Sequence, residues 1–223
     1  RTPARIAHDA DRMNFLSKSS PHLRAALISA AGLLAVSLFS PAHAHHPFQM
    51  GDSTELTAVQ GLLSGIGHPL LGPDHLLFLL AIAFIGLRRP RAWVIPLLAA
   101  GLGGSVLSQF IPLPDAVAPW AEAMVSLSLV VEGLMALTVA STRWLLPLVA
   151  LHGFLLGSTI VGAEPTPLFT YFLGLLIGQG ALLLVVSNWS RSLVERLGSK
   201  GQRLGAGIWM GIGMAFAWVA LID

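Results

Sequence analysis

Long runs of apolar residues dominate the chain, and short polar segments separate them at fairly regular intervals. Beyond about residue 55, each run is long enough to cross the roughly 30 Å of hydrocarbon in a bilayer as a helix. The pattern predicts six transmembrane helices, over residues 56–87, 92–111, 116–140, 144–163, 168–187 and 204–222. The predicted fold class is therefore all-α, a polytopic membrane helix bundle.

Composition supports a membrane protein and narrows its chemistry. Of the 223 residues, 54% are hydrophobic and 11% are charged, and the mean hydropathy is +0.74. Soluble domains average about 25% charged residues. The formal net charge of +2 is too small to indicate a nucleic-acid partner. Because the chain has no cysteine, disulfides and thiolate ligands are excluded, and any metal must be held by nitrogen and oxygen.

The first 44 residues are predicted to be an N-terminal extension and a cleavable secretory signal peptide. Two basic residues precede an apolar stretch over residues 25–39, and Ala42-His43-Ala44 forms an A-x-A cleavage site. The apolar stretch is shorter than the ~18 residues of a membrane span. An uncleaved signal anchor is the alternative. Residues 45–223 then form the six-helix transmembrane domain.

The basic residues predict the orientation of the helices. Segments 45–55, 112–115 and 164–167 contain no lysine or arginine. The other loops and their flanks hold all eight basic residues beyond position 45: Arg88, Arg89, Arg91, Arg143, Arg191, Arg196, Lys200 and Arg203. Basic loops stay on the cytoplasmic side. Both mature ends are therefore expected on the periplasmic side of a bacterial inner membrane, in agreement with a signal peptide.

Three ionisable residues, His68, Asp74 and His75, interrupt the first predicted span. Two prolines and a glycine between them should break the helix and free backbone carbonyls. Ionisable groups at membrane depth are costly and usually mark a functional site. Imidazole, carboxylate and carbonyl together suit a divalent metal such as nickel or cobalt. His68 as a cap of the helix break, and Asp74 as the N-cap of the second half, are the structural alternatives.

Further polar residues recur at matching distances from Thr142, where the third and fourth spans should form a tight hairpin. Glu132 and His152 each lie ten residues from it. In straight antiparallel helices they share a level near the bilayer centre, where they would complete the metal site. A buried structural hydrogen bond between them is the alternative. Glu122 lies near the outer surface.

The mature N-terminus begins with two further imidazoles. His45 and His46 are adjacent, and signal cleavage would leave them facing outward. Together with Glu122 they would collect cations from outside.

The sequence resembles a known family at this motif. Residues 68–75, read as HPLLGPDH, are similar to the H-P-x-x-G-x-D-H signature of the HupE/UreJ family of bacterial nickel/cobalt permeases. Two weaker patterns agree: the E-x5-S-x4-G spacing of Glu122, Ser128 and Gly133, and the pair His152-Gly153. The resemblance covers the whole mature chain. It implies uptake of nickel or cobalt, in support of hydrogenase, urease or cobalamin synthesis.

The chain departs from the family pattern at three positions. A second histidine and a glutamate usually follow the H-G pair, where this chain has Leu156 and Thr159. Glu132 stands where the family usually has an apolar residue. The site is therefore expected to be rearranged, with Glu132 compensating for the lost groups.

These observations favour a secondary permease that carries Ni²⁺ or Co²⁺ as substrate, with no permanently bound cofactor and with the lipid bilayer as its environment. Metal affinity should fall in acid, because protons compete for the ligands. A non-transporting assembly factor for a metalloenzyme is an alternative. An intramembrane metal-dependent hydrolase is a weaker one, since neither H-E-x-x-H nor G-x-S-x-G occurs. The metal, the coupling ion, a maturation partner and the oligomeric state stay open.

Overall fold

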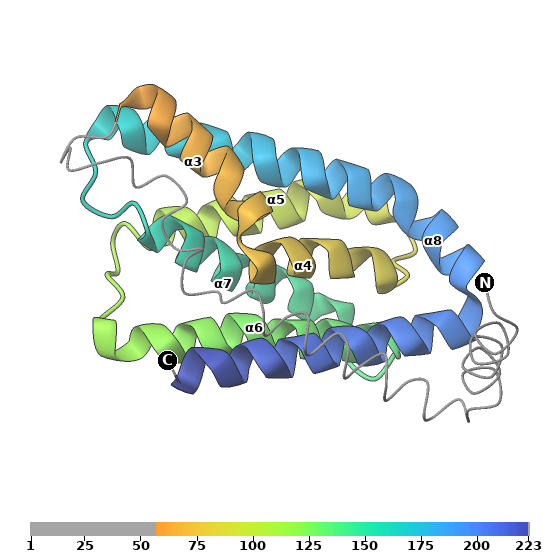
Figure 1. Cartoon of the computed structure of the whole chain (residues 1–223). Coiled ribbons are helices and arrows are strands. Elements are labelled where there is room, and N and C mark those ends of the chain that lie inside the picture. The colour runs from red at the N-terminus through yellow and green to blue at the C-terminus, as the bar shows by residue number, and fades with distance from the viewer. Residues whose placement is uncertain (1–56, 223) are drawn as a thin grey trace, which may run out of the picture.

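The computed structural model describes residues 57–222, and every regular element in that range is helical (Figure 1). The predicted all-α class is thus confirmed there. The predicted signal peptide, His45 and His46 lie outside the described residues. The α-helices are α3 (Ala58–Leu71), α4 (Pro73–Ala81), α5 (Pro90–Leu107), α6 (Ala118–Ala136), α7 (Leu145–Ser158) and α8 (Pro165–Ile222), with short 3-10 turns at Ile82–Phe84, Asp115–Val117 and Thr142–Trp144.

Helical segments occupy each of the six predicted span positions, but their lengths differ. Within residues 57–222, α5, α6 and α8 are each long and apolar enough to cross a membrane. Helix α3 and the segment Pro73–Phe84 pass the same test as a pair, bent by 64°. Helix α7 has 14 residues, fewer than the roughly 20 that a full span needs. Three helices and one bent pair are therefore of spanning length.

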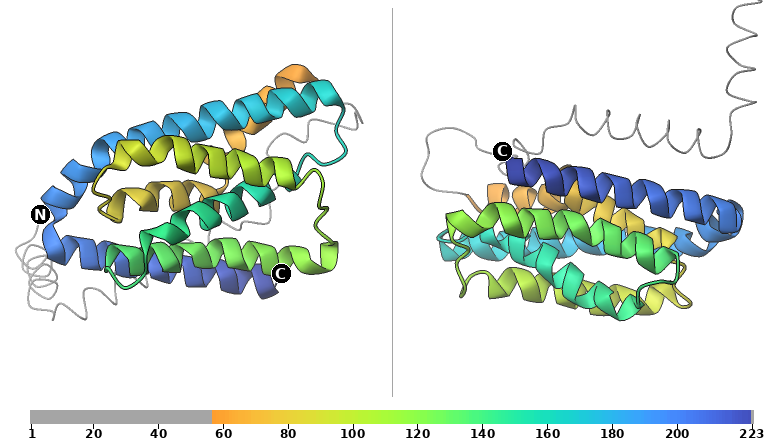
Figure 2. Two further views of the ribbon diagram at one scale, coloured as in Figure 1. Left: turned by 180° about the vertical axis from the view of Figure 1, so that it is seen from behind. Right: turned by 90° about the horizontal axis from the view of Figure 1, so that it is seen from below.

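Helix α8 consists of two limbs that meet at Gly198. This glycine has φ 59° and ψ −176°, a backbone conformation that is essentially confined to glycine. The chain turns back there, so the second limb runs beside α6 while the first lies beside α3 (Figures 1 and 2). The closest approaches are at small residues: Gly174 lies against Leu62 of α3, and Gly133 of α6 lies against Met210.

The second half of the broken helix, α4, lies among the other helices, whereas the first half, α3, lies along α8 at the edge of the bundle (Figure 1). Pro69 is in the last turns of α3, Gly72 is extended, and Pro73 begins α4. Proline is favoured at a first helical position because its missing N–H would have had no partner there. Phe78 of α4 is completely buried, in a core cluster to which α5, α6, α7 and α8 also contribute. The two imidazoles of the motif, His68 and His75, are thus buried, whereas Leu70 and Leu71 between them are exposed.

Helix α7 packs mainly against α5, and not against α6 as a tight hairpin would require. Glycines allow the two backbones to approach closely, with Gly104 against Ala150 and Gly153 against Gly101. Two hydrogen bonds cross the contact. Ser105 donates its hydroxyl to the carbonyl of Gly153 at 2.7 Å, and the Gln109 amide donates to the carbonyl of Gly157 at 2.8 Å.

The close contact between α5 and α7 yields a matched pair of substitutions. In Gly104→Ala the new Cβ would collide with the backbone of Ala150 and Phe154, whereas nothing lies within 4 Å of a Cβ at Gly103. We expect Gly104→Ala to destabilise the protein by about 1–3 kcal/mol, as overpacking typically does. Gly103→Ala should be neutral or slightly stabilising, because alanine is the better helix former. Equal melting temperatures for the two variants in detergent would contradict this packing.

Candidate metal site

Two imidazoles from different helices meet in the interior. His75, in the first turn of α4, places its Nδ1 atom 2.8 Å from the Nδ1 atom of His152 on α7. The ring centroids are 5.0 Å apart and the ring planes are inclined by 69°. The exposed fractions of the two residues are only 7% and 4%. The pair therefore joins α4 to α7 through nitrogen atoms that are shielded from solvent.

His152 is held on two further sides. The ring of Phe78 stacks on it, with centroids 3.8 Å apart and an interplanar angle of 21°. The Nε2 atom lies 2.8 Å from the hydroxyl oxygen of Ser128 on α6. Ser128 itself donates a hydrogen bond to the backbone carbonyl of Val125 at 2.5 Å. With its face and both nitrogens engaged, the ring has a defined orientation.

His68 belongs to a second polar cluster beside the first. Its ring centroid is 6.0 Å from that of His75, and its Nδ1 atom is 3.1 Å from the hydroxyl of Tyr171 on α8. Tyr171 donates to the carbonyl of Leu156 at 2.6 Å. Thr159 also contacts His68, with 3.5 Å between its Oγ1 atom and Nδ1. The ring of His75 is thus a neighbour of both other imidazoles, His68 and His152.

Asp74 is the most accessible member of the group. Its side chain is 23% exposed, and its Oδ2 atom lies 3.9 Å from Nδ1 of His75. The prediction that Asp74 is the N-cap of α4 is wrong. Gly72 is the N-cap, because its backbone is extended and the helix begins at the next residue, Pro73. Asp74 therefore lies inside the first turn. A carboxylate there still interacts favourably with the positive end of the helix dipole.

The two predicted glutamates are both on α6, on either side of Ser128 in the sequence. Glu132 does not face His152 directly, since His152 contacts Ser128, one helical turn earlier on α6. The arithmetic that placed them at one level assumes straight helices. The chain instead leaves α6 at Ala136, passes through Thr138 with φ 61°, and forms a 3-10 turn before α7. Glu122 is half-buried near the start of α6, about 9 Å along the axis from Ser128.

Glu132 lies in an environment that disfavours an ionised carboxylate. It is 1% exposed, and neither carboxylate oxygen has a hydrogen-bond partner among the described residues. Burying an ionised carboxylate without compensation costs several kcal/mol. Such a group is favoured only when it is neutral or when a cation comes beside it.

The imidazole pair has the right spacing for two neighbouring ligands of one cation. A cation about 2.0–2.1 Å from each nitrogen would subtend an angle of roughly 90° across their 2.8 Å separation. That angle suits the square-planar and octahedral geometries of nickel and cobalt better than tetrahedral zinc. In residues 57–222, no three His, Asp or Glu side chains are close enough to hold a metal ion together. The site therefore consists of two neighbouring imidazoles, without a third such side chain close enough to complete a metal site in this range.

Three residues that shape the site escape prediction from sequence. Phe78 is one of many apolar residues. Tyr171 is the sole tyrosine of the chain, but nothing in the sequence relates it to His68, which is 103 residues away. Ser128 is part of the family-like pattern, yet its contact with His152 depends on the path of the chain between α6 and α7. For Thr159 a signal exists, because it lies seven residues after His152 and so on the same helix face.

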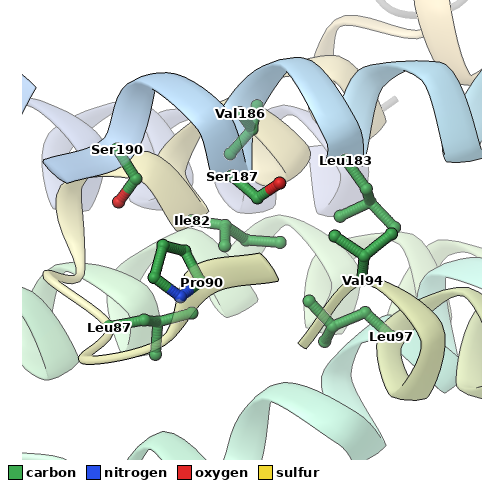
Figure 3. A pocket seen from close by; sticks show the side chains of 9 residues that line it. All are labelled: Ile82, Leu87, Pro90, Val94, Leu97, Leu183, Val186, Ser187 and Ser190. Carbon is green, nitrogen blue, oxygen red and sulfur yellow. The ribbon is translucent and has the colours of Figure 1, made fainter. Parts of the chain in front are cut away.

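A separate small pocket lies toward the end of the α4 segment and carries no comparable chemistry (Figure 3). Its lining is almost entirely apolar, with two serines. Their hydroxyls are used by the backbone, since Ser187 donates to Leu184 and Ser190 donates to Ala83. The pocket is lined by Ile82, Leu87, Pro90, Val94, Leu97, Leu183, Val186, Ser187 and Ser190.

Comparison with known protein families gives a match over most of the chain. The family model described as HupE / UreJ protein matches residues 33–216, which is most of the chain. No curated protein and no solved structure matches it.

The geometry predicts that His75 and His152 act as a unit in binding metal. Replacement of either by phenylalanine keeps a ring in place and removes the nitrogen ligands. We expect each single variant to lower the nickel affinity of the purified protein by at least tenfold, and the double variant to be little worse than the weaker single variant. Titration of nickel into detergent-solubilised protein measures this. Losses that simply add would mean that the two rings bind independently.

Proposed function

The chain belongs to the HupE/UreJ family, and from this premise we propose that it is a secondary permease for the uptake of a divalent transition metal, nickel or cobalt. The family is linked to nickel or cobalt transport or to metalloenzyme maturation. Among these roles, transport accounts best for three neighbouring imidazoles that are buried among apolar helices.

The observation that carries the proposal is the buried His75–His152 pair. Two imidazole nitrogens at this separation, with a carboxylate close by at Asp74, form a nitrogen and oxygen donor set. Such a set suits nickel and cobalt. An all-protein cage would hold a cation too firmly to release it, whereas conduction requires binding that is weak or divided among several sites. The open pair, with His68 as its neighbour, meets that requirement.

The proposed path runs from Glu122, through the three imidazoles, to Glu132. In the predicted orientation α6 begins near the periplasmic side, so Glu122 receives the cation first. Ser128 is next along α6, beside the His75–His152 pair, and Glu132 follows one turn further inward. His45 and His46 would add an outer collecting site ahead of Glu122.

The energy for uptake would come from the membrane. The sequence contains no nucleotide-binding motif. A doubly charged cation that moves inward gains about 4.6 kcal/mol per 100 mV of membrane potential, which is twice the value for one charge. The proposed location is the bacterial inner membrane, with both mature ends on the periplasmic side.

The proposal is tested by uptake of radioactive nickel and cobalt into cells that express the protein. We expect accumulation above empty-vector cells that disappears, to below about a tenth of the wild-type rate, in Asp74→Asn and in His75→Ala. Membrane abundance of each variant must equal that of the wild type. Addition of the unlabelled metals in competition then ranks nickel against cobalt.

No accumulation by properly inserted wild-type protein would contradict an autonomous nickel or cobalt permease. It would favour the metal-holding assembly factor instead. Normal uptake by both variants would show that the cation takes a route other than the motif.

Glu132 provides a separate test of the path. Glu132→Gln keeps the shape of the side chain and removes a buried charge that has no partner among the described residues. We expect uptake to fall at least tenfold while the melting temperature stays equal or rises, because an unpaired buried carboxylate is destabilising. Glu195→Gln makes the same charge change at an exposed position and should leave uptake unchanged. A Glu132→Gln variant with normal uptake would remove Glu132 from the path.

A further inference from the structure

Two of the three buried imidazoles contact a hydroxyl group that is itself anchored to a helix carbonyl. His68 contacts Tyr171, which lies 2.6 Å from the carbonyl oxygen of Leu156. His152 contacts Ser128, which lies 2.5 Å from the carbonyl oxygen of Val125. The direction of the hydrogen bonds in these chains determines which ring nitrogen carries hydrogen.

In the first chain the tyrosine proton lies between Tyr171 and Leu156. A carbonyl oxygen has no hydrogen, and two oxygens approach to 2.6 Å only when a proton lies between them. The hydroxyl of Thr159 also donates to Leu156, at 2.9 Å. Leu156 accepts both because it lies in the last turn of α7, where carbonyls lack helical partners. Neither hydroxyl therefore supplies a hydrogen to His68, and His68 must donate from Nδ1 to Tyr171.

The same argument applies to the second chain, but there it places the hydrogen on Nε2 of the imidazole instead of Nδ1. At 2.5 Å from the carbonyl of Val125, Ser128 has its single proton committed to that bond. Its oxygen then accepts from His152, whose Nε2 atom must carry the hydrogen. A neutral imidazole has one N–H. The lone pair of His152 is therefore on Nδ1, the atom that faces His75.

We propose that Tyr171 and Ser128 are positioning residues that fix His68 and His152 in opposite tautomers and so select the nitrogen that each ring offers to the cation. His68 is held with its lone pair on Nε2, and His152 with its lone pair on Nδ1. This inference rests on the proposed function for the identity of the ligand, but the tautomers themselves do not depend on transport.

Tyr171 and Ser128 support the rings through neutral hydroxyls. A carboxylate partner raises the basicity of a metal-binding imidazole. A hydroxyl orients the ring without adding charge. Thr159, which stands where a glutamate is usual in the family, reinforces this uncharged support at His68. The consequence is a site that orients its ligands fully yet binds the cation moderately, as a transported ion requires.

Ring nitrogen NMR on the full-length protein, labelled at histidine with nitrogen-15 and reconstituted in lipid bilayers without metal, tests the inference. Protonated and unprotonated ring nitrogens have well-separated resonances. We expect Nδ1–H in His68 and Nε2–H in His152. Tyr171→Phe should convert His68 to a mixture of tautomers and leave His152 unchanged, and Ser128→Ala should do the reverse.

The matched control is Ser190→Ala. Ser190 is as deeply buried as Ser128 and also donates to a helix carbonyl, but its bond goes to Ala83, away from the imidazoles. It should change neither tautomer. Nickel affinity should fall about 10–100-fold in Tyr171→Phe and in Ser128→Ala, recover in Ser128→Thr, and stay unchanged in Ser190→Ala.

Three results would overturn the inference: reversed tautomers in the wild type, tautomers that do not respond to the substitutions, or a response with no loss of nickel affinity. A different result would separate it from the proposed function. If the tautomers respond as expected but the wild type binds neither nickel nor cobalt, the positioning by hydroxyls stands and the permease proposal fails.

Discussion

Helices α4 and α7 are joined by a hydrogen bond between two imidazoles, at a place where neither ring can turn to water instead. The other polar contacts of the site likewise give buried ring nitrogens a partner. His152 must satisfy its second nitrogen, and it does so through Ser128 on α6. His68 satisfies one nitrogen through Tyr171 on α8. The polar groups thereby connect five helices, α3, α4, α6, α7 and α8, that are otherwise held by apolar packing and close glycine contacts.

The sequence was sufficient for the features that depend on local chemistry. The prolines and glycine of the motif predict a helix break, and the break lies at Gly72. The imidazoles of the motif and of His152 were candidates from their cost in an apolar span, and His75 and His152 do meet. The family resemblance is confirmed by the match over residues 33–216.

What the sequence could not supply depends on the path of the chain between helices. Counting residues from Thr142 aligned His152 with Glu132, whereas the turn that begins near Ala136 aligns it with Ser128. The predicted hairpin of the third and fourth spans also gives way to the contact between α7 and α5, because glycines on those two helices permit a closer approach. Tyr171 becomes part of the site only through the packing of α8 against α3. Neither spacing nor residue type encodes such long-range contacts.

The turn at Gly198 lets the two limbs of α8 contact the supports of two different imidazoles. Its first limb carries Tyr171, which holds His68, and its second limb packs against α6, which carries Ser128 and so holds His152. Hinges are short segments that absorb large changes in backbone angle, and Gly198 is the point in α8 where the helix is already interrupted. A change of backbone angle at Gly198 would move one limb relative to the other. Because the first limb carries Tyr171 and the second packs against α6, such a change would alter the supports of His68 and His152 together.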